Sequence, residues 1–167
     1  MMKCLIIFLL FLLVVLRIHA QSGFDARIAE AAKTLTCPAP DDRNPVSLNA
    51  QLLQEKDSIA IIVKVVIAPG WHIYQYVPSS LPYIVIGHIL ELPETVRASG
   101  SWIEPRPTSY ANDPGVLVYE NEAVFIQKAV KSAAAKAGNP IRTGLFYQTC
   151  DLRQCLPPDE KMVDLKL

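Results

Sequence analysis

Two cysteines near the end of the sequence, Cys150 and Cys155, are the residues whose type and spacing suggest chemistry. Four residues separate them, and they stand behind the aromatic pair Phe146-Tyr147 and ahead of Pro157-Pro158. A disulfide between them closes a small ring, which on the chain-entropy estimate stabilises a fold by only about 2 kcal/mol. The same proximity suits thiol–disulfide exchange, because one thiol quickly resolves a mixed disulfide formed by the other. Spacing alone leaves a structural bridge and a redox pair equally open, since Cys-x4-Cys lacks the helix-terminus geometry of Cys-x-x-Cys.

The other two cysteines constrain the redox reading. Cys4 lies in an apolar N-terminal segment, so a chain without that segment keeps Cys37, Cys150 and Cys155. An odd number of cysteines in an oxidising compartment means that at least one is free, exchanging or paired with another molecule. Three interpretations of Cys37 are consistent with the sequence: a third redox partner, a dimer crosslink or a buried free thiol. We favour the free thiol.

The first twenty residues have the anatomy of a secretory signal peptide. Lys3 supplies a positive start, residues 4–16 form an unbroken apolar run, and Ala20 provides a small residue before the expected cleavage site. The run is short for a membrane span, and Arg17 ends it. An uncleaved N-terminal anchor is the alternative. We expect an exported or periplasmic protein that is soluble and has no membrane span once the signal is removed.

Charge and composition exclude several classes of function. Removal of residues 1–20 takes away Lys3 and Arg17 and leaves 14 basic residues of the original 16, against 16 acidic residues. A chain that is slightly acidic offers no basic footprint for nucleic acid or anionic membranes. The sequence also holds no phosphate-binding glycine loop and no nucleophile–histidine–acid set.

The elements that must position the cysteines read as β-strands. Apolar residues alternate along 46–52, and residues 58–68 are dense in Ile and Val on both faces, as in a central sandwich strand. Further strands are expected at 71–76, 83–90, 116–119, 123–130, 141–147 and 163–167. Residues 93–114 read as loop, and residues 131–138 as a short helix or a polar connection. This number of short strands is typical of an all-β sandwich.

The region before residue 44 differs from the rest. Ile28, Ala31, Ala32 and Leu35 recur at helical spacing, which predicts a short helix. Three prolines within residues 37–45 then break regular structure. We therefore expect a signal peptide at 1–20, a helix with a linker or strap at 21–43, and one β-sandwich domain at 44–167.

Several motifs together resemble one known family. Gly70-Trp71-His72-Ile73-Tyr74 is followed by Tyr147-Gln148-Thr149-Cys150, by Cys155-Leu156-Pro157-Pro158 and by a terminal Val-x-Leu strand. This set resembles the N-terminal periplasmic domain of the DsbD thiol:disulfide interchange proteins, from about Asn44 to the end of the chain. The resemblance implies an immunoglobulin-like β-sandwich with a cysteine pair on adjoining strands near one end. It also implies thioredoxin-like partner proteins as electron donor or client, a protein-disulfide reductase activity, and no small cofactor.

The resemblance also suggests roles for individual residues. Cys155 matches the cysteine that forms the mixed disulfide, and Cys150 matches the resolving one. Tyr74 matches an aromatic residue beside the pair, and Tyr147 lies within the same motif. His72, two residues before Tyr74 on the same strand face, stands where the family often has another aromatic residue. An imidazolium there would stabilise a thiolate; the alternative is a partly buried histidine bonded to the backbone.

The sequence departs from the family in two respects. Family members shield the cysteines with a loop that carries an aromatic cap, and here the matching region is 109–115. Tyr110 is the candidate cap and Asp113 an acidic neighbour, but no aromatic residue directly precedes Gly115. The sequence to Leu167 also lacks the membrane segments and the thioredoxin-like domain of the family's best-known arrangement. We therefore expect a separate protein to supply the electrons.

Other candidate sites are weaker. A copper site built from His72, His88, Met162 and a cysteine pair lacks any His-x-x-His or Met-rich motif, so we expect no metal. The acidic residues of 120–122 and 159–160 read as solvated turn charges. Two hypotheses remain: a thiol–disulfide relay through Cys150 and Cys155, and a non-catalytic β-sandwich that binds another protein and keeps the disulfide for structure.

Overall fold

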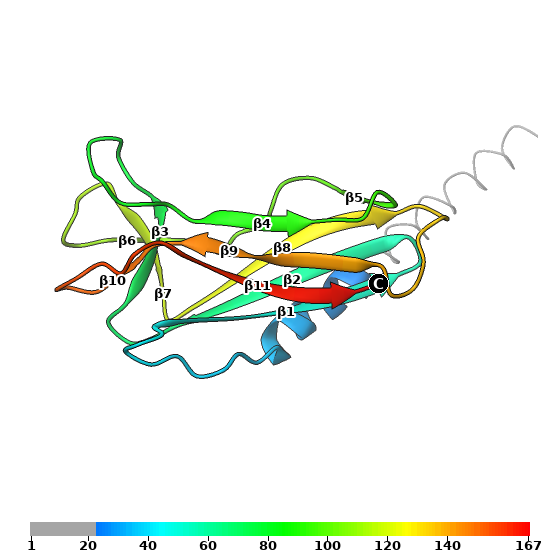
Figure 1. Ribbon diagram of the computed structural model, residues 1–167, viewed down its shortest axis with the longest axis horizontal. Helices are drawn as coiled ribbons and strands as arrows, with labels where there is room; N and C mark the ends of the chain where they lie inside the picture. Colours follow the sequence, from blue (N-terminus) through cyan, green and yellow to red (C-terminus); the bar gives the residue numbers. More distant parts are fainter. Residues whose placement is uncertain (1–22) are drawn as a thin grey trace, which may run out of the picture. The chain divides into compact units, whose positions relative to one another are not determined.

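The structure, a computed structural model, describes residues 23–167 (Figure 1). The chain divides into two compact units, Met1–Thr34 and Leu35–Leu167. In the first unit, the described residues 23–34 form one helix, which confirms the short N-terminal helix. The predicted signal peptide at residues 1–20 lies outside the described residues. Within residues 23–167, no helix has the length and apolarity needed to cross a membrane.

The second unit consists of β-strands. They form three antiparallel sheets, with the strand orders β1-β2-β8-β5, β10-β3-β7-β6 and β11-β9-β4. The strands are β1 (Val46–Glu55), β2 (Ser58–Ile67), β3 (His72–Tyr76), β4 (Gly87–Glu91), β5 (Val96–Ala98), β6 (Thr108–Ser109), β7 (Leu117–Glu120), β8 (Glu122–Lys131), β9 (Pro140–Tyr147), β10 (Thr149–Cys150) and β11 (Asp159–Lys166).

The main core lies between two of these sheets. Strand β2 is central in its sheet, between β1 and β8, as its density of β-branched residues predicted. Its residues Ile59, Ile61 and Val63 pack in one cluster with Phe125 of β8 and Leu145 of β9. Sheet β11-β9-β4 therefore covers β1-β2-β8-β5, and Figure 1 shows their strands running lengthwise together. This arrangement confirms the all-β, immunoglobulin-like sandwich class.

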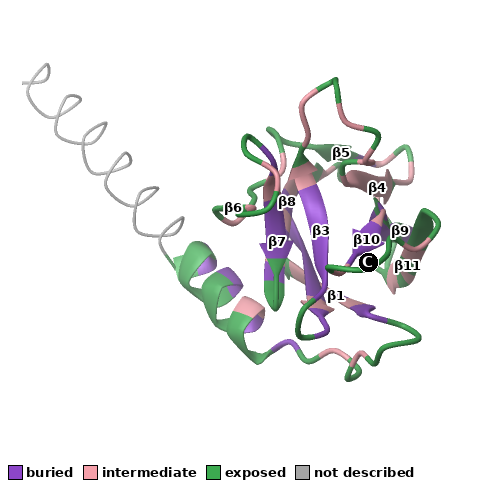
Figure 2. Ribbon diagram, turned by 90° about the vertical axis from the view of Figure 1, so that its left-hand side faces the viewer, coloured by how far each residue is buried: buried purple, intermediate pink, exposed green. Residues whose placement is uncertain are grey.

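The third sheet, β10-β3-β7-β6, lies at one end of this unit, on the left of Figure 1. The chain enters it from β2 through a turn at Gly70, whose φ of 83° is in the left-handed region that favours glycine. It returns to β8 through Asn121, whose carbonyl oxygen accepts a 2.7 Å hydrogen bond from the amide of Ile67. Figure 2 shows β3, β7 and β10 as largely buried. The end sheet is thus joined covalently and by hydrogen bonds to the sandwich that supports it.

The structure differs from the sequence expectations in its short and edge strands. Two short strands, β5 and β6, lie in the stretch expected to be loop, because their neighbours β8 and β7 supply the pairing. Strand β4 begins at Gly87 instead of residue 83. Strand β11 begins at Asp159 instead of residue 163. This edge strand pairs only with β9, and the charged residues in its first half leave no apolar alternation that would indicate a strand. Residues 132–139 form a turn-rich connection with no helix.

Candidate functional site

Cys150 and Cys155 are joined by a disulfide at the end sheet. Cys150 ends β10, where it pairs with β3, and it forms an isolated antiparallel bridge with Cys155. The two sulfur-bearing residues differ in exposure: Cys150 is 1% exposed, whereas Cys155 is exposed. Cys155 is therefore the more accessible end of the disulfide.

The four residues between the cysteines form a tight turn. The side-chain Oδ1 of Asp151 accepts hydrogen bonds from the backbone amides of Arg153 and Gln154, both at 2.7 Å. These amides hold the pKa of Asp151 below its usual value, so its carboxylate is ionised at neutral pH. Leu152, at the outer part of this turn, is 77% exposed. The turn thus presents Cys155 beside an exposed apolar side chain.

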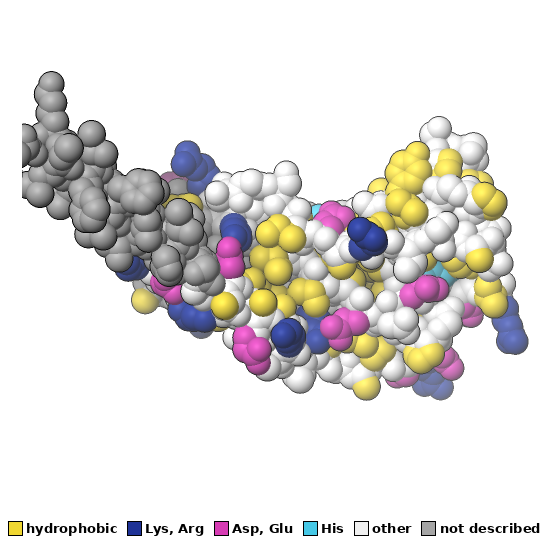
Figure 3. Space-filling view, turned by 180° about the vertical axis from the view of Figure 1, so that it is seen from behind, with side chains coloured by type: hydrophobic (Ala, Val, Ile, Leu, Met, Phe, Trp, Pro, Cys, Tyr) yellow, Lys and Arg dark blue, Asp and Glu magenta, His cyan; other side chains and the backbone are white. Residues whose placement is uncertain are grey.

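Hydrophobic side chains gather at the end of the unit that carries β3 and β10, on the right of Figure 3. Tyr76 at the end of β3 is exposed, as are Val85, which bridges to Tyr74, and Leu152 in the disulfide turn. Single exposed apolar residues are ordinary. Of these three, Leu152 bears on the site, because it lies in the turn that joins the two cysteines.

His72 is the direct strand partner of Cys150, so both side chains project from the same face of the end sheet. The imidazole ring lies 4.4 Å from the Tyr110 ring and 5.0 Å from the Tyr74 ring, measured between centroids. Burial lowers the pKa of His72 below 6.5, although the carboxylates of Asp151 and Asp113 oppose this shift. His72 is therefore neutral at pH 7, which does not favour the imidazolium hypothesis.

Burial of His72 predicts a pH dependence of stability. The unfolded chain binds a proton at His72 near pH 6.5, whereas the folded chain binds it only at lower pH. Stability is therefore complete above about pH 6.5 and decreases as the pH falls from 6.5 to the lower folded pKa, by at most about 1.4 kcal/mol per pH unit. Urea unfolding of the wild type and of His72→Phe across this pH range measures the contribution of His72. The difference between their free energies of unfolding isolates it, because the carboxylates titrate in the same way in both proteins. Parallel curves for the two proteins would contradict the prediction.

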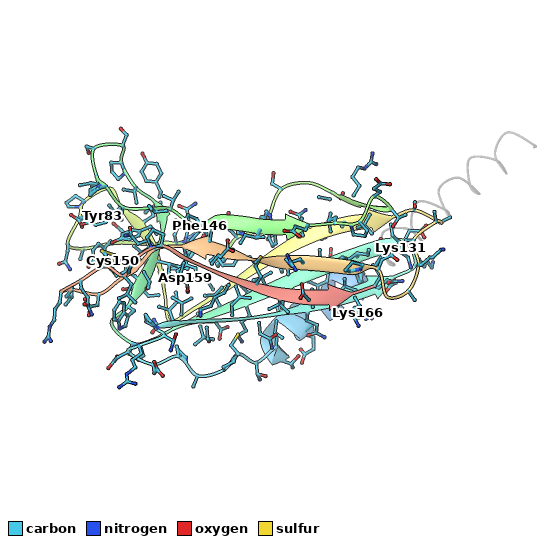
Figure 4. All side chains as sticks on the ribbon, viewed as in Figure 1. Tyr83, Lys131, Phe146, Cys150, Asp159 and Lys166 are labelled. Carbon is cyan, nitrogen blue, oxygen red and sulfur yellow. A yellow bond between two sulfur atoms is a disulfide. The ribbon has the colours of Figure 1, made fainter. Side chains whose placement is uncertain are left out.

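Tyr74 packs in a small second core beneath the disulfide. Its ring stacks on Tyr83 with centroids 4.7 Å apart and planes 8° from parallel. The cluster is completed by Cys150, Val116 and Val118, and Figure 4 shows Tyr83 and Cys150 at the same end of the unit. Burial raises the pKa of the Tyr74 phenol, and the Asp113 carboxylate raises that of Tyr83, so both remain protonated.

The loop before β7 brings Tyr110 and Asp113 to this cluster. The backbone amide of Tyr110 donates to the carbonyl of Val116, and the amide of Val116 donates to the carbonyl of Asp113. The hydroxyl of Tyr83 donates a 3.4 Å hydrogen bond to Oδ2 of Asp113. Tyr110 thus lies against His72, on the side of the sheet that carries Cys150.

Tyr147 is the one predicted site residue that the structure places elsewhere. It lies in the main core, and its hydroxyl donates a 3.1 Å hydrogen bond to Oδ2 of Asp159. It also lines an open groove of about 280 Å³ together with Thr149, Leu156 and Pro157. Side chains alternate along an extended chain, so residues three apart point to opposite sides, which separates Tyr147 from Cys150.

Sequence reasoning missed Tyr83 as a member of the site. The apolar pattern predicts a strand that begins at Tyr83, but this residue lies in the segment between β3 and β4 and its ring stacks on Tyr74. The spacing of apolar residues does not predict this contact, because the residues between β3 and β4 show neither the two-residue period of a strand nor the 3.6-residue period of a helix. The parallel bridge between Tyr74 and Val85 fixes the segment beside β3.

Within residues 23–167, one further cysteine and one further histidine lie apart from the disulfide. Cys37 is free and partly buried, its Sγ donates to the carbonyl oxygen of Lys64, and burial raises its pKa. His88 stacks on Trp102, and its Nε2 is 2.9 Å from Oε1 of Glu104. In residues 23–167, no group of three or more His, Cys, Asp or Glu side chains is arranged to hold a metal ion.

Comparison with solved structures finds several partial matches. The reduced DsbD N-terminal domain of Neisseria meningitidis is 20% identical, with 71% of this chain and 84% of that chain covered and a TM-score of 0.46. The same domain in its complex with the PilB N-terminal domain is 19% identical, covering 70% and 80%, with a TM-score of 0.41. The GAE domain of GGA2p from Saccharomyces cerevisiae is 9% identical, covering 79% and 94%, with a TM-score of 0.42. All three scores lie below 0.5.

Comparison at the level of sequence families is more specific. No curated protein matches the chain. The family model described as "Thiol:disulfide interchange protein DsbD, N-terminal" matches residues 32–167, which include β1 to β11 and both cysteines of the disulfide. This chain therefore belongs to the family of DsbD N-terminal thiol:disulfide interchange domains.

Proposed function

We propose that this protein is an exported thiol–disulfide interchange domain that relays reducing equivalents to or from partner proteins through Cys150 and Cys155. The observation that carries the proposal is the disulfide with one buried and one exposed cysteine, within a chain of the DsbD N-terminal family. Thioredoxin-like proteins are the partners, as electron donor, as client, or as both. The domain acts as a protein-disulfide reductase and uses no small cofactor.

The mechanism is a pair of thiol–disulfide exchanges. In the reduced protein, the exposed Cys155 thiolate attacks a client disulfide and forms a mixed disulfide. Cys150 then attacks the Cys155 sulfur, which releases the reduced client and restores the Cys150–Cys155 bond. A donor thiolate that attacks Cys155 reopens the bond with Cys150 as the leaving group. Cys155 is thus the exchanging residue and Cys150 the resolving residue.

The surrounding residues support this division of roles. The cluster of His72, Tyr74, Tyr83 and Tyr110 covers the Cys150 side of the bond and keeps water and small thiols from it. Tyr110 is the aromatic cap and Asp113 its acidic neighbour, held by Tyr83. The exposed Leu152 offers the partner an apolar contact next to Cys155.

The proposal extends to processing and location. Residues 1–20 direct export and are removed, residues 21–43 precede the domain as helix and strap, and residues 44–167 form the interchange domain. The mature protein works in the periplasm or another exported location, where client disulfides form.

Replacing Cys150 and Cys155 together by serine separates this function from a structural role. A ring this small contributes about 2 kcal/mol to the free energy of unfolding, so we expect a loss of at most about that size and a retained fold. Transfer of electrons from the reduced protein to the disulfide of a thioredoxin-like protein should fall to background. Urea unfolding and a coupled transfer assay provide the two readouts.

The matched control is Cys37→Ser, which removes the free thiol and leaves the disulfide intact. It should transfer electrons at the wild-type rate. If the double serine variant kept the transfer activity, or if the control lost it, the disulfide would not be the relay. A double serine variant that was less stable but, while folded, still bound the same partner would instead favour the protein-binding sandwich with a structural disulfide.

A further inference from the structure

The structure leaves one nitrogen beside the disulfide without a hydrogen-bond partner. His72 is 2% exposed, and among the described residues its buried Nε2 has no partner. A buried polar atom without a partner is unfavourable, because it has lost its bonds to water, so native proteins keep few of them. An apolar ring in the same position would avoid this cost. The orphaned nitrogen therefore needs a reason other than stability.

The position of His72 suggests that reason. It is the direct antiparallel partner of Cys150, and side chains so paired have Cβ atoms about 4.5–5.5 Å apart on one face. The rings of Tyr110 and Tyr74 both pack against the imidazole, the first tilted and the second edge-on. His72 is thus the titratable side chain placed directly across from the buried sulfur.

Resolution of a mixed disulfide poses a chemical problem at this sulfur. The nucleophile is the thiolate, so the Cys150 thiol has to lose its proton before it attacks. Cys150 is 1% exposed, which keeps hydroxide and buffer bases away from it. The neighbouring phenols of Tyr74 and Tyr83 are protonated and offer no basic group at neutral pH.

We propose that neutral His72 is the general base for Cys150, accepting its proton on Nε2 when this thiol resolves the mixed disulfide at Cys155. This inference rests on the proposed function and assigns a catalytic residue to its second step. The partner that Nε2 lacks in the oxidised protein is the thiol of Cys150 in the reduced one. Nε2 therefore lacks a partner only in the oxidised protein, in which Cys150 has no thiol proton to donate.

The step balances in atoms and electrons. The Cys150 proton moves to Nε2, and the Cys150 thiolate attacks the Cys155 sulfur. The Cys150–Cys155 bond forms, and the bond between Cys155 and the partner's sulfur breaks. The partner's sulfur leaves with the electron pair as a thiolate, so the partner is reduced while the two cysteines are oxidised. The proton on His72 passes to water or to the departing thiolate.

The charged groups around His72 suit this role. Asp151 follows β10, Asp113 lies in the loop before β7, and Glu120 is the residue of β7 that pairs with His72. Burial keeps the imidazole neutral and ready to accept a proton, while Asp151 and Asp113 favour the imidazolium that forms. Similar arrangements of a base with stabilising carboxylates support proton transfer at neutral pH.

A two-step reaction with a small disulfide probe tests the inference. Reduced protein carrying Cys37→Ser is mixed with 5,5′-dithiobis(2-nitrobenzoate). Attack by Cys155 releases one thionitrobenzoate, and resolution by Cys150 releases the second. Stopped-flow absorbance follows both releases from pH 5 to 9 in the wild-type background, in His72→Phe and His72→Gln, and in the matched control His88→Gln. His88 is a partly buried histidine whose Nδ1 also lacks a hydrogen-bond partner, but its Nε2 is 2.9 Å from Oε1 of Glu104.

Loss of the base should slow only the second release. We expect it to fall at least about 10-fold at pH 7 in both His72 variants, with the first release within about 2-fold of the parent. The parent's second rate should level off above the pKa of His72, whereas the variants should rise with pH up to the pKa of the thiol. His88→Gln should behave as the parent. Unchanged second rates and pH profiles in folded His72 variants would overturn the inference.

A measurement without substitution covers the case in which the variants do not fold. The ¹⁵N shifts of the His72 ring in the oxidised and reduced wild type report its hydrogen bonding and titration. The inference predicts that Nε2 gains a partner and that the titration midpoint moves on reduction. Identical shifts and midpoints in the two states would overturn it. Because the probe is a small disulfide, these results are independent of whether any thioredoxin-like protein is a partner, which is the separate test of the proposed function.

Discussion

Replacing Cys150 by serine should leave a thiol at Cys155 that reacts about 100-fold faster than the thiol left by Cys155→Ser. Cys155 is exposed in the turn after β10, whereas Cys150 is 1% exposed under the aromatic cluster. A reagent reaches Cys150 only after the structure opens locally, and each 1.4 kcal/mol of opening free energy reduces the rate tenfold. Iodoacetamide labelling of both variants in the Cys37→Ser background, followed by mass spectrometry, measures the two rates.

The same variants should differ as traps for partners. Cys150→Ser keeps the exchanging thiol but lacks the resolving one, so mixed disulfides should accumulate with an oxidised thioredoxin-like protein. Cys155→Ser should form few. Labelling in denaturant is the control, since both thiols should then react at the same rate. Equal native rates, or a faster Cys150, would reverse the roles assigned to the two cysteines.

Gly144→Ala should destabilise the domain by roughly 3 kcal/mol or more, one of the largest losses expected for a single methyl group. Gly144 lies in β9 opposite Met162 of β11. A Cβ at this position would overlap the backbone carbonyl of Lys161 on the edge strand. Backbone atoms held in a ladder do not move aside as a flexible side chain does, so β9 and β11 would separate there.

Gly87→Ala provides the matched control. Gly87 lies in β4, in the same sheet, and a Cβ there would meet only the Phe146 side chain at an ordinary 3.8 Å. We expect a change within about 1 kcal/mol, because glycine in a strand is itself slightly unfavourable. Thermal and urea unfolding of both variants measure the difference. Comparable stability for the two variants would show that β11 is not held against β9 as described.

The sandwich could be predicted from the sequence because three of its strands, β2, β8 and β9, are long and bury regularly placed apolar residues. The run of Ile and Val in β2 and the alternation in β9 follow directly from their positions inside the main core. The pairing of these strands into three sheets could not be predicted, because it depends on contacts between residues far apart in the chain. Short strands such as β6 contain too few residues to show an apolar alternation. They form only where a neighbouring strand, here β7, supplies backbone hydrogen-bond partners.

The site was predictable in part for the same reason. His72 and Tyr74 are two residues apart in a strand, so a shared face follows from geometry, and β3 has that geometry. Tyr147 and Cys150 are three residues apart, so their side chains point to opposite sides of an extended chain. The family motif groups the two residues and gives no indication of this separation. The contrast in burial between Cys150 and Cys155 had no sequence signal, because it arises from the turn between them and from the aromatic residues folded over one side.

The most direct test of the account is the reduction potential of the Cys150–Cys155 pair, measured by equilibration with glutathione or dithiothreitol and thiol trapping in the native state. An exchangeable disulfide in a small ring with one exposed cysteine should have a potential between about −180 and −270 mV, with Cys155 trapped readily. A potential below about −300 mV, with trapping only after denaturation, would mark a structural bridge. The relay would then give way to the non-catalytic protein-binding sandwich.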